Sequence, residues 1–264
     1  MIRTSPVAIL ALSLLAALVL ALLYGPLFVA IFFSFFRFEH NEVQWMSFSF
    51  DAYRELVHDQ GIIDALTNTV IVGSSAVVLS LVLGTLIAFT YHASRSPMRE
   101  VLQLVVFLPF LMPPIITGLS LLIFFRETDV PRSLMTVILG HMVFVLAIVY
   151  RIVLTRLQAL RPSLVEASLD LGASRWQTFR HVLAPNLMTA LISAAILAFA
   201  LSFDETLITL LVTGTSNTLP MRLWAMMRLG FTPDINALVS LILVGTAAFA
   251  LIALRVVKLP QENR

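Results

Sequence analysis

Two adjacent carboxylates, Asp204 and Glu205, follow the apolar run Leu187–Phe203. A carboxylate left in lipid costs at least about 2.5–3.5 kcal/mol, so both side chains should face protein or water. Successive residues of a helix point about 100° apart, so only one of the two should face a given pore. The pair has two interpretations: charge selection of a cationic solute in a substrate pathway, or a helix-end anchor that bonds neighbouring helices.

Three prolines, Pro109, Pro113 and Pro114, lie close together in another apolar run. Each proline removes a backbone donor and crowds the preceding turn, so the helix is predicted to be kinked or broken near mid-membrane. Transporters often place their sites at such breaks. The prolines therefore indicate either a static kink filled by neighbouring helices or a flexible wall of a substrate pathway.

No other residues form a pattern with catalytic or metal-binding chemistry. The chain has no cysteine, its five histidines show no metal-ligand spacing, and it contains no GxxxxGK[ST] phosphate loop. His141 and Asn68 are lone polar residues in apolar surroundings, for which we predict buried, hydrogen-bonded roles. We expect no catalytic residue, no metal site and no cofactor on this chain, so it is not expected to be an enzyme.

The composition indicates an all-α membrane protein. Apolar residues make up 59% of the chain and charged residues 12%, against about 25% charged in soluble domains. A helix needs about 20 apolar residues to cross a bilayer, and six segments approach or exceed that length. The six predicted transmembrane helices are Val7–Phe36, Ala65–Tyr91, Val101–Phe125, Leu134–Leu157, Asn186–Val212 and Asn236–Val257.

The positions of lysine and arginine predict the orientation of the helices. If both termini are cytoplasmic, most of the 17 Lys and Arg residues fall on the inner side, including Arg3, Arg95 and five arginines between 151 and 180. We divide the chain into a first helix and outer segment (1–60), a membrane domain (61–258) and a cytoplasmic tail (259–264). Short helices are expected outside the membrane at 51–58, capped by Ser49 or Asp51, and at 220–230.

A polar, arginine-rich interval at 158–185 separates two of the apolar runs. Ser163 and Glu166 have the spacing of a capping box, which predicts a helix beginning near residue 163. Ser174 and Gln177 repeat this spacing and predict a second short helix after Gly172. The two helices would form a compact cytoplasmic knob.

This interval resembles the cytoplasmic EAA loop of permease subunits in ATP-binding-cassette (ABC) importers. The family pattern is Glu-Ala-Ala, three residues, Gly, nine residues and Ile-x-Leu-Pro. The chain matches it at Glu166, Ala167, Gly172 and Pro185, and departs from it at Ser168, Val182 and Ala184. The departures are mild changes in size.

Further segments are similar to the second permease subunit of polyamine importers of the spermidine/putrescine type. They are residues 109–120, the 166–185 loop, Leu201–Glu205, Leu219-Pro220 and 233–237, and the likeness extends over about residues 60–257. In related importers of anions a Gly-Glu pair occupies the positions of Asp204 and Glu205. The resemblance therefore implies that Glu205 is architectural and that Asp204 determines the substrate class.

The resemblance implies a type I ABC importer permease fold, with six helices and a cytoplasmic coupling helix, in the inner membrane of a bacterium. It implies as partners an ATPase dimer that holds ATP and Mg²⁺, a second permease, a periplasmic or lipid-anchored solute-binding protein and membrane lipid, but no nucleic acid. In this family Ser163, Glu166, Ala167, Gly172 and Pro185 would couple the permease to the ATPase. The alternatives are the same architecture for another small organic solute, or a self-contained secondary transporter, which would need its own coupling-ion site.

The predicted orientation can be tested by cysteine labelling, because the native chain has no cysteine background. A cysteine at Ser94 or Ser174 should react only from the cytoplasm, and one at Ser49 or Ser216 only from outside. The measurement is the reaction of a membrane-impermeant thiol reagent with intact cells and with inverted vesicles. Labelling of position 174 from outside would invert the topology and exclude ATPase docking at the 158–185 loop.

Overall fold

The computed structural model describes residues 6–39, 42–94, 96–229 and 233–258. The predicted 259–264 tail, Arg3, Arg95 and Gly230 lie outside these residues. The chain divides into two compact units, Met1–Ile63 with Leu223–Ala250 and Asp64–Arg222 with Leu251–Arg264, which are described separately.

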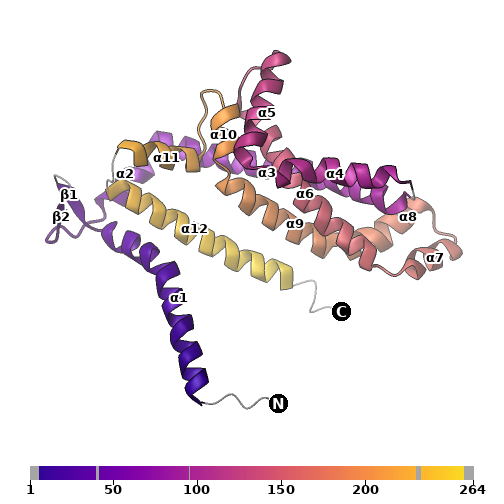
Figure 1. Ribbon diagram of the computed structural model, residues 1–264, viewed down its shortest axis with the longest axis horizontal. Helices are drawn as coiled ribbons and strands as arrows, with labels where there is room; N and C mark the ends of the chain where they lie inside the picture. The colour runs from indigo at the N-terminus through magenta and orange to yellow at the C-terminus, as the bar shows by residue number, and fades with distance from the viewer. Residues whose placement is uncertain (1–5, 40–41, 95, 230–232, 259–264) are drawn as a thin grey trace. The chain divides into compact units, whose positions relative to one another are not determined.

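The larger unit is a helical bundle with one helix, α6, at its centre (Figure 1). Its elements are α3 (Gln60–Ala93), α4 (Met98–Leu111), α5 (Pro114–Glu127), α6 (Leu134–Ala159), α7 (Pro162–Asp170), α8 (Arg175–Thr178), the π-helix η1 (Phe179–Leu183), α9 (Ala184–Asp204) and α10 (Leu207–Val212). Helix α6 packs against α4, α5, α9 and α10, and residues such as Tyr150 and Leu154 are fully buried there. Helix α3 also contacts α6, because Ser80 Oγ donates to the Met142 carbonyl over 3.1 Å.

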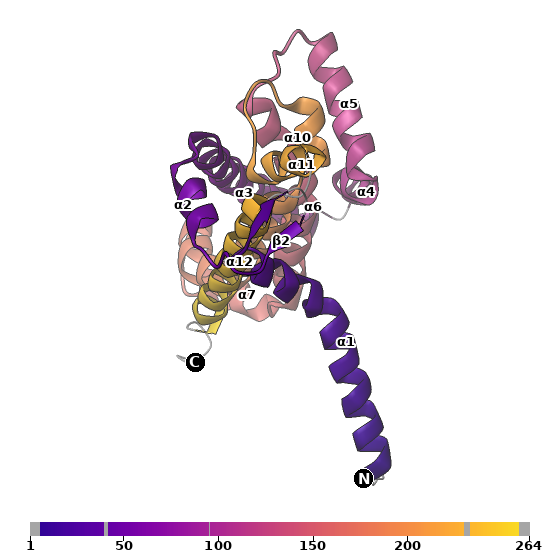
Figure 2. The same cartoon turned by 90° about the vertical axis from the view of Figure 1, so that its left-hand side faces the viewer.

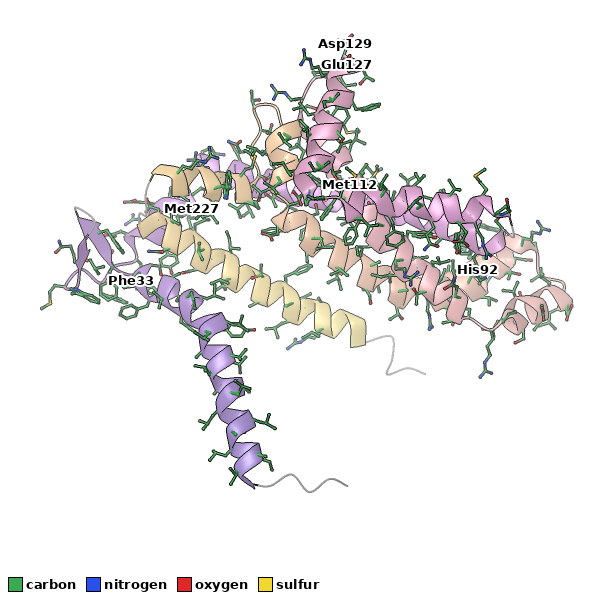
Figure 3. All side chains as sticks on the ribbon, viewed as in Figure 1. Phe33, His92, Met112, Glu127, Asp129 and Met227 are labelled. Carbon is green, nitrogen blue, oxygen red and sulfur yellow. The ribbon has the colours of Figure 1, made fainter. Side chains whose placement is uncertain are left out.

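The proline-rich run is broken as predicted. Helix α4 ends at Leu111, α5 begins at Pro114, and the two helices are bent by 107° (Figure 2). Pro113 has no N–H to offer the carbonyl of Pro109 four residues earlier. The Thr117 hydroxyl replaces that donor and binds the Pro109 carbonyl over 3.0 Å. Met112 lies at the bend, and Glu127 and Asp129 lie at the far end of α5 (Figure 3).

The predicted span Asn186–Val212 is wrong at both ends. A continuous helical run extends from Arg175 to Asp204, because the short helix predicted after Gly172 continues directly into the span. The helix then stops at Asp204, Glu205 is extended, and α10 forms a separate short helix. Asp204 and Glu205 therefore lie at a second helix break and not inside a continuous helix.

The smaller unit contains α1 (Pro6–Phe33), strands β1 (Arg37–Glu39) and β2 (Glu42–Gln44), α2 (Asp51–His58), and most of α11 (Leu219–Leu229) and α12 (Pro233–Lys258). The strands form an antiparallel hairpin in which Arg37 pairs with Gln44, and no sequence signal predicted this hairpin. Helix α2 has its predicted bounds. The predicted cap at Ser49 or Asp51 is wrong, because Phe50 is the N-cap of α2 and Asp51 is its first residue, although the Ser49 hydroxyl accepts from the Asp51 N–H over 2.9 Å.

Among the described residues, five helices are long and apolar enough to cross a membrane. The number of spans rises to six if the bent α4–α5 pair is counted as one span. The other spans match the predicted ones to within a few residues at each end. The all-α, six-helix prediction therefore holds, with one span broken in the middle.

Candidate functional site

Helix α7, the first helix of the 158–185 loop, begins one residue before the predicted start near residue 163. Pro162 is the first residue of α7, Arg161 is the N-cap, and no side chain caps the helix. Proline has a fixed backbone angle that suits the first helical position, which moves Ser163 into the helix. The predicted Ser163 cap is therefore wrong. The predicted Ser174 cap is confirmed, because the Ser174 and Gln177 side chains each bond the other residue's N–H.

Gly172 forms the junction between α7 and α8. Its φ of +82° lies in the left-handed region, which costs a residue with a side chain about 1–2 kcal/mol. The Gly172 N–H bonds the Leu169 carbonyl over 2.9 Å, and the Ala173 N–H bonds the Ser168 carbonyl over 3.1 Å. Apart from the two neighbouring residues, no atom of the described residues would lie within 4 Å of a Cβ at this position. The glycine is therefore required by the backbone conformation and not by lack of space.

One hydrogen bond within the loop and one at its base hold the loop together. The Ser168 and Thr178 hydroxyls are 3.0 Å apart, which links α7 to α8. Arg156, near the end of α6, donates from Nε to the Asn186 carbonyl over 2.9 Å, one residue after Pro185. Glu166 and Ala167 lie on α7, which packs against α8 and η1, and η1 continues directly into α9.

Leu171 and Trp176 are the most exposed of the large apolar side chains on this knob. Leu171 is 88% exposed and Trp176 is 66% exposed, with the indole stacked on Phe179 at 5.5 Å between ring centroids. Large apolar groups held out to solvent on an ordered surface are typical of protein contacts. The sequence pattern identified the turn but missed these two residues, because single apolar residues in a polar loop carry no periodic signal.

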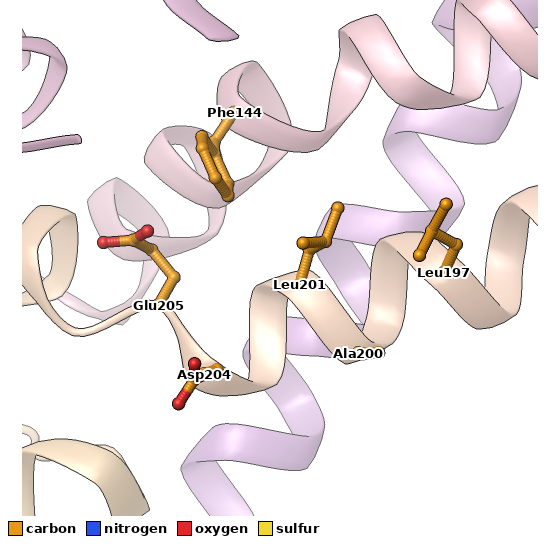
Figure 4. A pocket seen from close by; sticks show the side chains of 6 residues that line it. All are labelled: Phe144, Leu197, Ala200, Leu201, Asp204 and Glu205. Atoms are coloured by element: carbon orange, nitrogen blue, oxygen red, sulfur yellow. The ribbon is translucent and has the colours of Figure 1, made fainter. Parts of the chain in front are cut away.

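The carboxylates at the second break have different environments. Glu205 is 8% exposed, and its Oε1 accepts from the Ile208 N–H over 2.9 Å, so it caps the start of α10. Asp204 is exposed, and none of the described residues gives its carboxylate a hydrogen bond or an ion pair. The two side chains point in different directions (Figure 4).

His141 of α6 holds the two sides of this break together. Its Nδ1 lies 2.8 Å from the Ser202 hydroxyl on α9, and its Nε2 lies 2.8 Å from the Thr209 hydroxyl on α10. The single Thr209 hydroxyl hydrogen goes to the Glu205 carbonyl at 3.0 Å, so Nε2 must donate to Thr209. In the neutral ring Nδ1 then accepts from Ser202. The prediction of a buried, hydrogen-bonded histidine is confirmed.

Asn68 is also hydrogen-bonded as predicted. Its amide donates to the Asn217 carbonyl over 3.0 Å, although the residue is only half-buried. The hydroxyl of the adjacent Thr69 accepts from the Leu219 N–H over 2.7 Å. The two residues hold the start of α3 against the segment that follows α10.

A hollow of about 260 Å³ lies beside the second break. Its lining is Phe144, Leu197, Ala200, Leu201, Asp204 and Glu205 (Figure 4). Pro113 and Pro114 are not part of this lining, although α5, which begins at Pro114, packs against α10. A Cβ on Gly118 of α5 would lie 3.1 Å from the Ile208 Cα of α10. The two breaks are thus joined by close contact of two short helices.

A helical bundle with one broken span, a second helix break beside an apolar hollow and carboxylates, and a capped loop between two membrane-length helices is typical of a membrane transport subunit. The profile of the family described as "Binding-protein-dependent transport system inner membrane component" matches residues 62–259. The chain belongs to this family. It is the permease subunit of an ABC importer, a multi-pass inner-membrane protein that is not itself an enzyme and has no cofactor of its own.

Curated relatives match most of the chain. The putrescine transport system permease protein PotI of Escherichia coli (strain K12) is 33% identical over 237 residues, covering 86% of this chain and 84% of that protein. The spermidine/putrescine transport system permease protein PotC of Haemophilus influenzae is 27% identical over 236 residues, covering 89% and 91%.

Solved structures share the fold. A bacterial ABC transporter that imports the acidic polysaccharide alginate has a TM-score of 0.71 at 16% identity, over 96% of this chain and 94% of that one. The MetNI methionine ABC transporter in an inward-facing conformation has a TM-score of 0.65 at 21% identity, over 80% and 99%. These matches establish the ABC importer permease fold.

We predict that replacing His141 with leucine loosens the second break. The change removes the ring partner of the Ser202 hydroxyl, at about 1–3 kcal/mol for a buried polar group, while the Thr209 hydroxyl keeps its bond to the Glu205 carbonyl. The Tm of the purified complex should fall by several degrees. The matched control is His92→Leu, since His92 is exposed, and this variant should keep the Tm of the parent. An equal Tm in both variants would show that His141 does not hold the break.

Proposed function

We propose that this permease moves a small cationic amine, a polyamine such as putrescine or spermidine, into the cell. The observation that carries the proposal is the Asp204 carboxylate, exposed beside the hollow with no bonding partner among the described residues. An unpaired carboxylate in a membrane protein is available to a cationic ligand. The relatives named for putrescine and spermidine transport support the same class of solute.

The surroundings of Asp204 suit the shape of such a solute. A polyamine carries ammonium groups separated by methylene chains. The carboxylate can bind an ammonium group, and the apolar side chains of Phe144, Leu197 and Leu201 can contact the methylenes. Glu205 is occupied as a helix cap, so Asp204 is the carboxylate available to the solute. Another small organic cation would fit the same features and is the alternative.

The proposed mechanism is alternating access driven by a partner ATPase dimer. A periplasmic or lipid-anchored binding protein delivers the solute to a path formed with a second, homologous permease. The 158–185 loop docks on the ATPase through α7 and the exposed side chains of Leu171 and Trp176. Moving a path from 1:99 to 99:1 outward-facing requires about 5.5 kcal/mol of differential binding, which ATP bound at two sites can supply.

Because the ATPase is cytoplasmic, this mechanism requires the 158–185 loop on the cytoplasmic side, and we propose the topology and the division of the chain accordingly. Both termini are cytoplasmic, residues 61–258 form the importer domain, and residues 1–60 add a first helix and an outer segment. Pro113 and Pro114 act indirectly in the solute pathway, since α5 transmits movement at the first break to α10.

The substrate class can be tested by neutralising each carboxylate separately. Asp204→Asn removes the unpaired charge, and we expect putrescine or spermidine uptake to fall about tenfold or more, equivalent to about 1.4 kcal/mol or more. Glu205→Gln is the matched control, because its side-chain carbonyl can still accept from Ile208, and uptake should be retained. The measurement is radiolabelled uptake normalised to the assembled complex. Unchanged uptake in Asp204→Asn would contradict a cationic substrate bound at this residue.

The coupling role of the knob can be tested at Gly172. Gly172→Leu places a side chain at a left-handed position, which should displace α7 from α8. We expect the subunit to remain in the membrane but to lose solute-stimulated ATP hydrolysis in the reconstituted complex. Gly172→Asn is the matched control, because asparagine tolerates this conformation and should preserve most of the activity. Full uptake by Gly172→Leu would remove the loop from the mechanism.

A further inference from the structure

An exposed cluster of aromatic rings lies at the end of α1 and on the hairpin that follows. It contains nine residues: Phe32, Phe33, Phe35, Phe36, Phe38, Trp45, Phe48, Phe50 and Tyr53. Phe35 is at its centre, with ring centroids 5.5 Å from Phe48, 5.4 Å from Phe50 and 5.4 Å from Tyr53. Phe36 connects it to Trp45 at 5.8 Å. We refer to these nine residues as the aromatic cluster.

Polar contacts beneath the rings hold the cluster in one arrangement. Ser34 is 1% exposed, donates to the Ile31 carbonyl over 2.5 Å, and lies 2.6 Å from the Tyr53 hydroxyl. Arg37 forms an ion pair with Asp51, and this hydrogen bond holds the pKa of the Asp51 carboxyl below its usual range. These contacts tie α1, β1 and α2 together, so the aromatic cluster is a built surface.

Much of this surface is exposed within the chain. Trp45 is 64% exposed, Phe48 64%, Phe50 62%, and the neighbouring Met46 is 103% exposed. An ordered apolar surface of this kind marks contact with another protein or with lipid. The rigid polar framework beneath it shows that the exposure is not the result of an unfolded loop.

The continuity of the cluster with α1 favours lipid. Helix α1 has 28 residues, and none of its most apolar window is buried within the chain. Such a helix is about 42 Å long, while the hydrocarbon core of a bilayer is about 30 Å thick. The end of α1 at Phe33 therefore reaches the headgroup level, where tryptophan and other amphipathic rings concentrate at the membrane–water interface.

We propose that the aromatic cluster inserts into the membrane–water interface and binds the boundary between lipid headgroups and acyl chains. In this arrangement Trp45, Met46 and Phe48 lie among the lipids, while the Arg37–Asp51 pair remains at the polar side. The cluster fixes the depth of α1, which has few contacts of its own within the chain.

The test is a spin label at Met46→Cys in the complete importer, reconstituted in liposomes with partner subunits that lack reactive thiols. This chain has no native cysteine, and Met46 is fully exposed, so the label should leave the rings in place. Collision rates are measured with oxygen, which concentrates in lipid, and with a water-soluble nickel chelate. The matched control is Glu55→Cys, an exposed charged position on α2.

We expect the ratio of oxygen to nickel collisions to be several-fold higher at position 46 than at position 55. An equal ratio would place the cluster in water and overturn the proposal. Low collision rates with both reagents at position 46 would show that another protein, such as the binding protein or the second permease, covers it, and would also overturn the proposal. As an independent measurement, Trp45→Phe should remove part of the tryptophan fluorescence that brominated lipids quench.

Discussion

A polypeptide in a bilayer must satisfy its backbone polar groups internally, and the larger unit depends on how it meets this constraint at two helix breaks. At the first break, the Thr117 hydroxyl supplies the donor that proline cannot give to the Pro109 carbonyl. At the second break, the Glu205 carboxylate binds the Ile208 N–H, and Thr209 binds the Glu205 carbonyl. Side chains thus replace the missing helical bonds, and irregular backbone can exist within the membrane domain beside the hollow.

The side-chain hydrogen bonds at the two breaks explain which parts of the fold could be predicted from the sequence. The first break was predictable because proline leaves a local chemical signature at Pro109, Pro113 and Pro114. The second break was missed because neither proline nor glycine marks it, and the Glu205 carboxylate binds the Ile208 N–H of the next helix there. The depth and charge of Asp204 and Glu205 were readable from the sequence. Their different environments depend on contacts with residues distant in the sequence, such as Phe144, which lines the same hollow.

In the knob, too, the features that depend on a few neighbouring residues could be predicted, and the others could not. Gly172 and the Ser174 cap follow from backbone rules that act over a few residues, and both were predictable. The role of Ser163 was misjudged because Pro162 competes for the same helix start and has the stronger preference. The exposed side chains of Leu171 and Trp176 were not predicted, and neither was the hairpin with its aromatic cluster. Both are recognised by the solvent exposure of their side chains, which the periodicity of a sequence does not reveal.

The helical run from Arg175 to Asp204 has a thermodynamic consequence. It contains 30 residues, begins in the knob and ends at the unpaired carboxylate, so one rod of about 45 Å joins the proposed ATPase-docking end to the proposed solute-binding end. Two ligands that bias the position of the same rod must affect each other equally. If nucleotide binding changes the affinity of the permease for its solute by some factor, solute bound near Asp204 changes nucleotide affinity by the same factor. The π-turn at Phe179–Leu183 interrupts the α-helical geometry of this rod, and its stiffness sets the size of the coupling free energy, while the equality of the two effects holds whatever that size is.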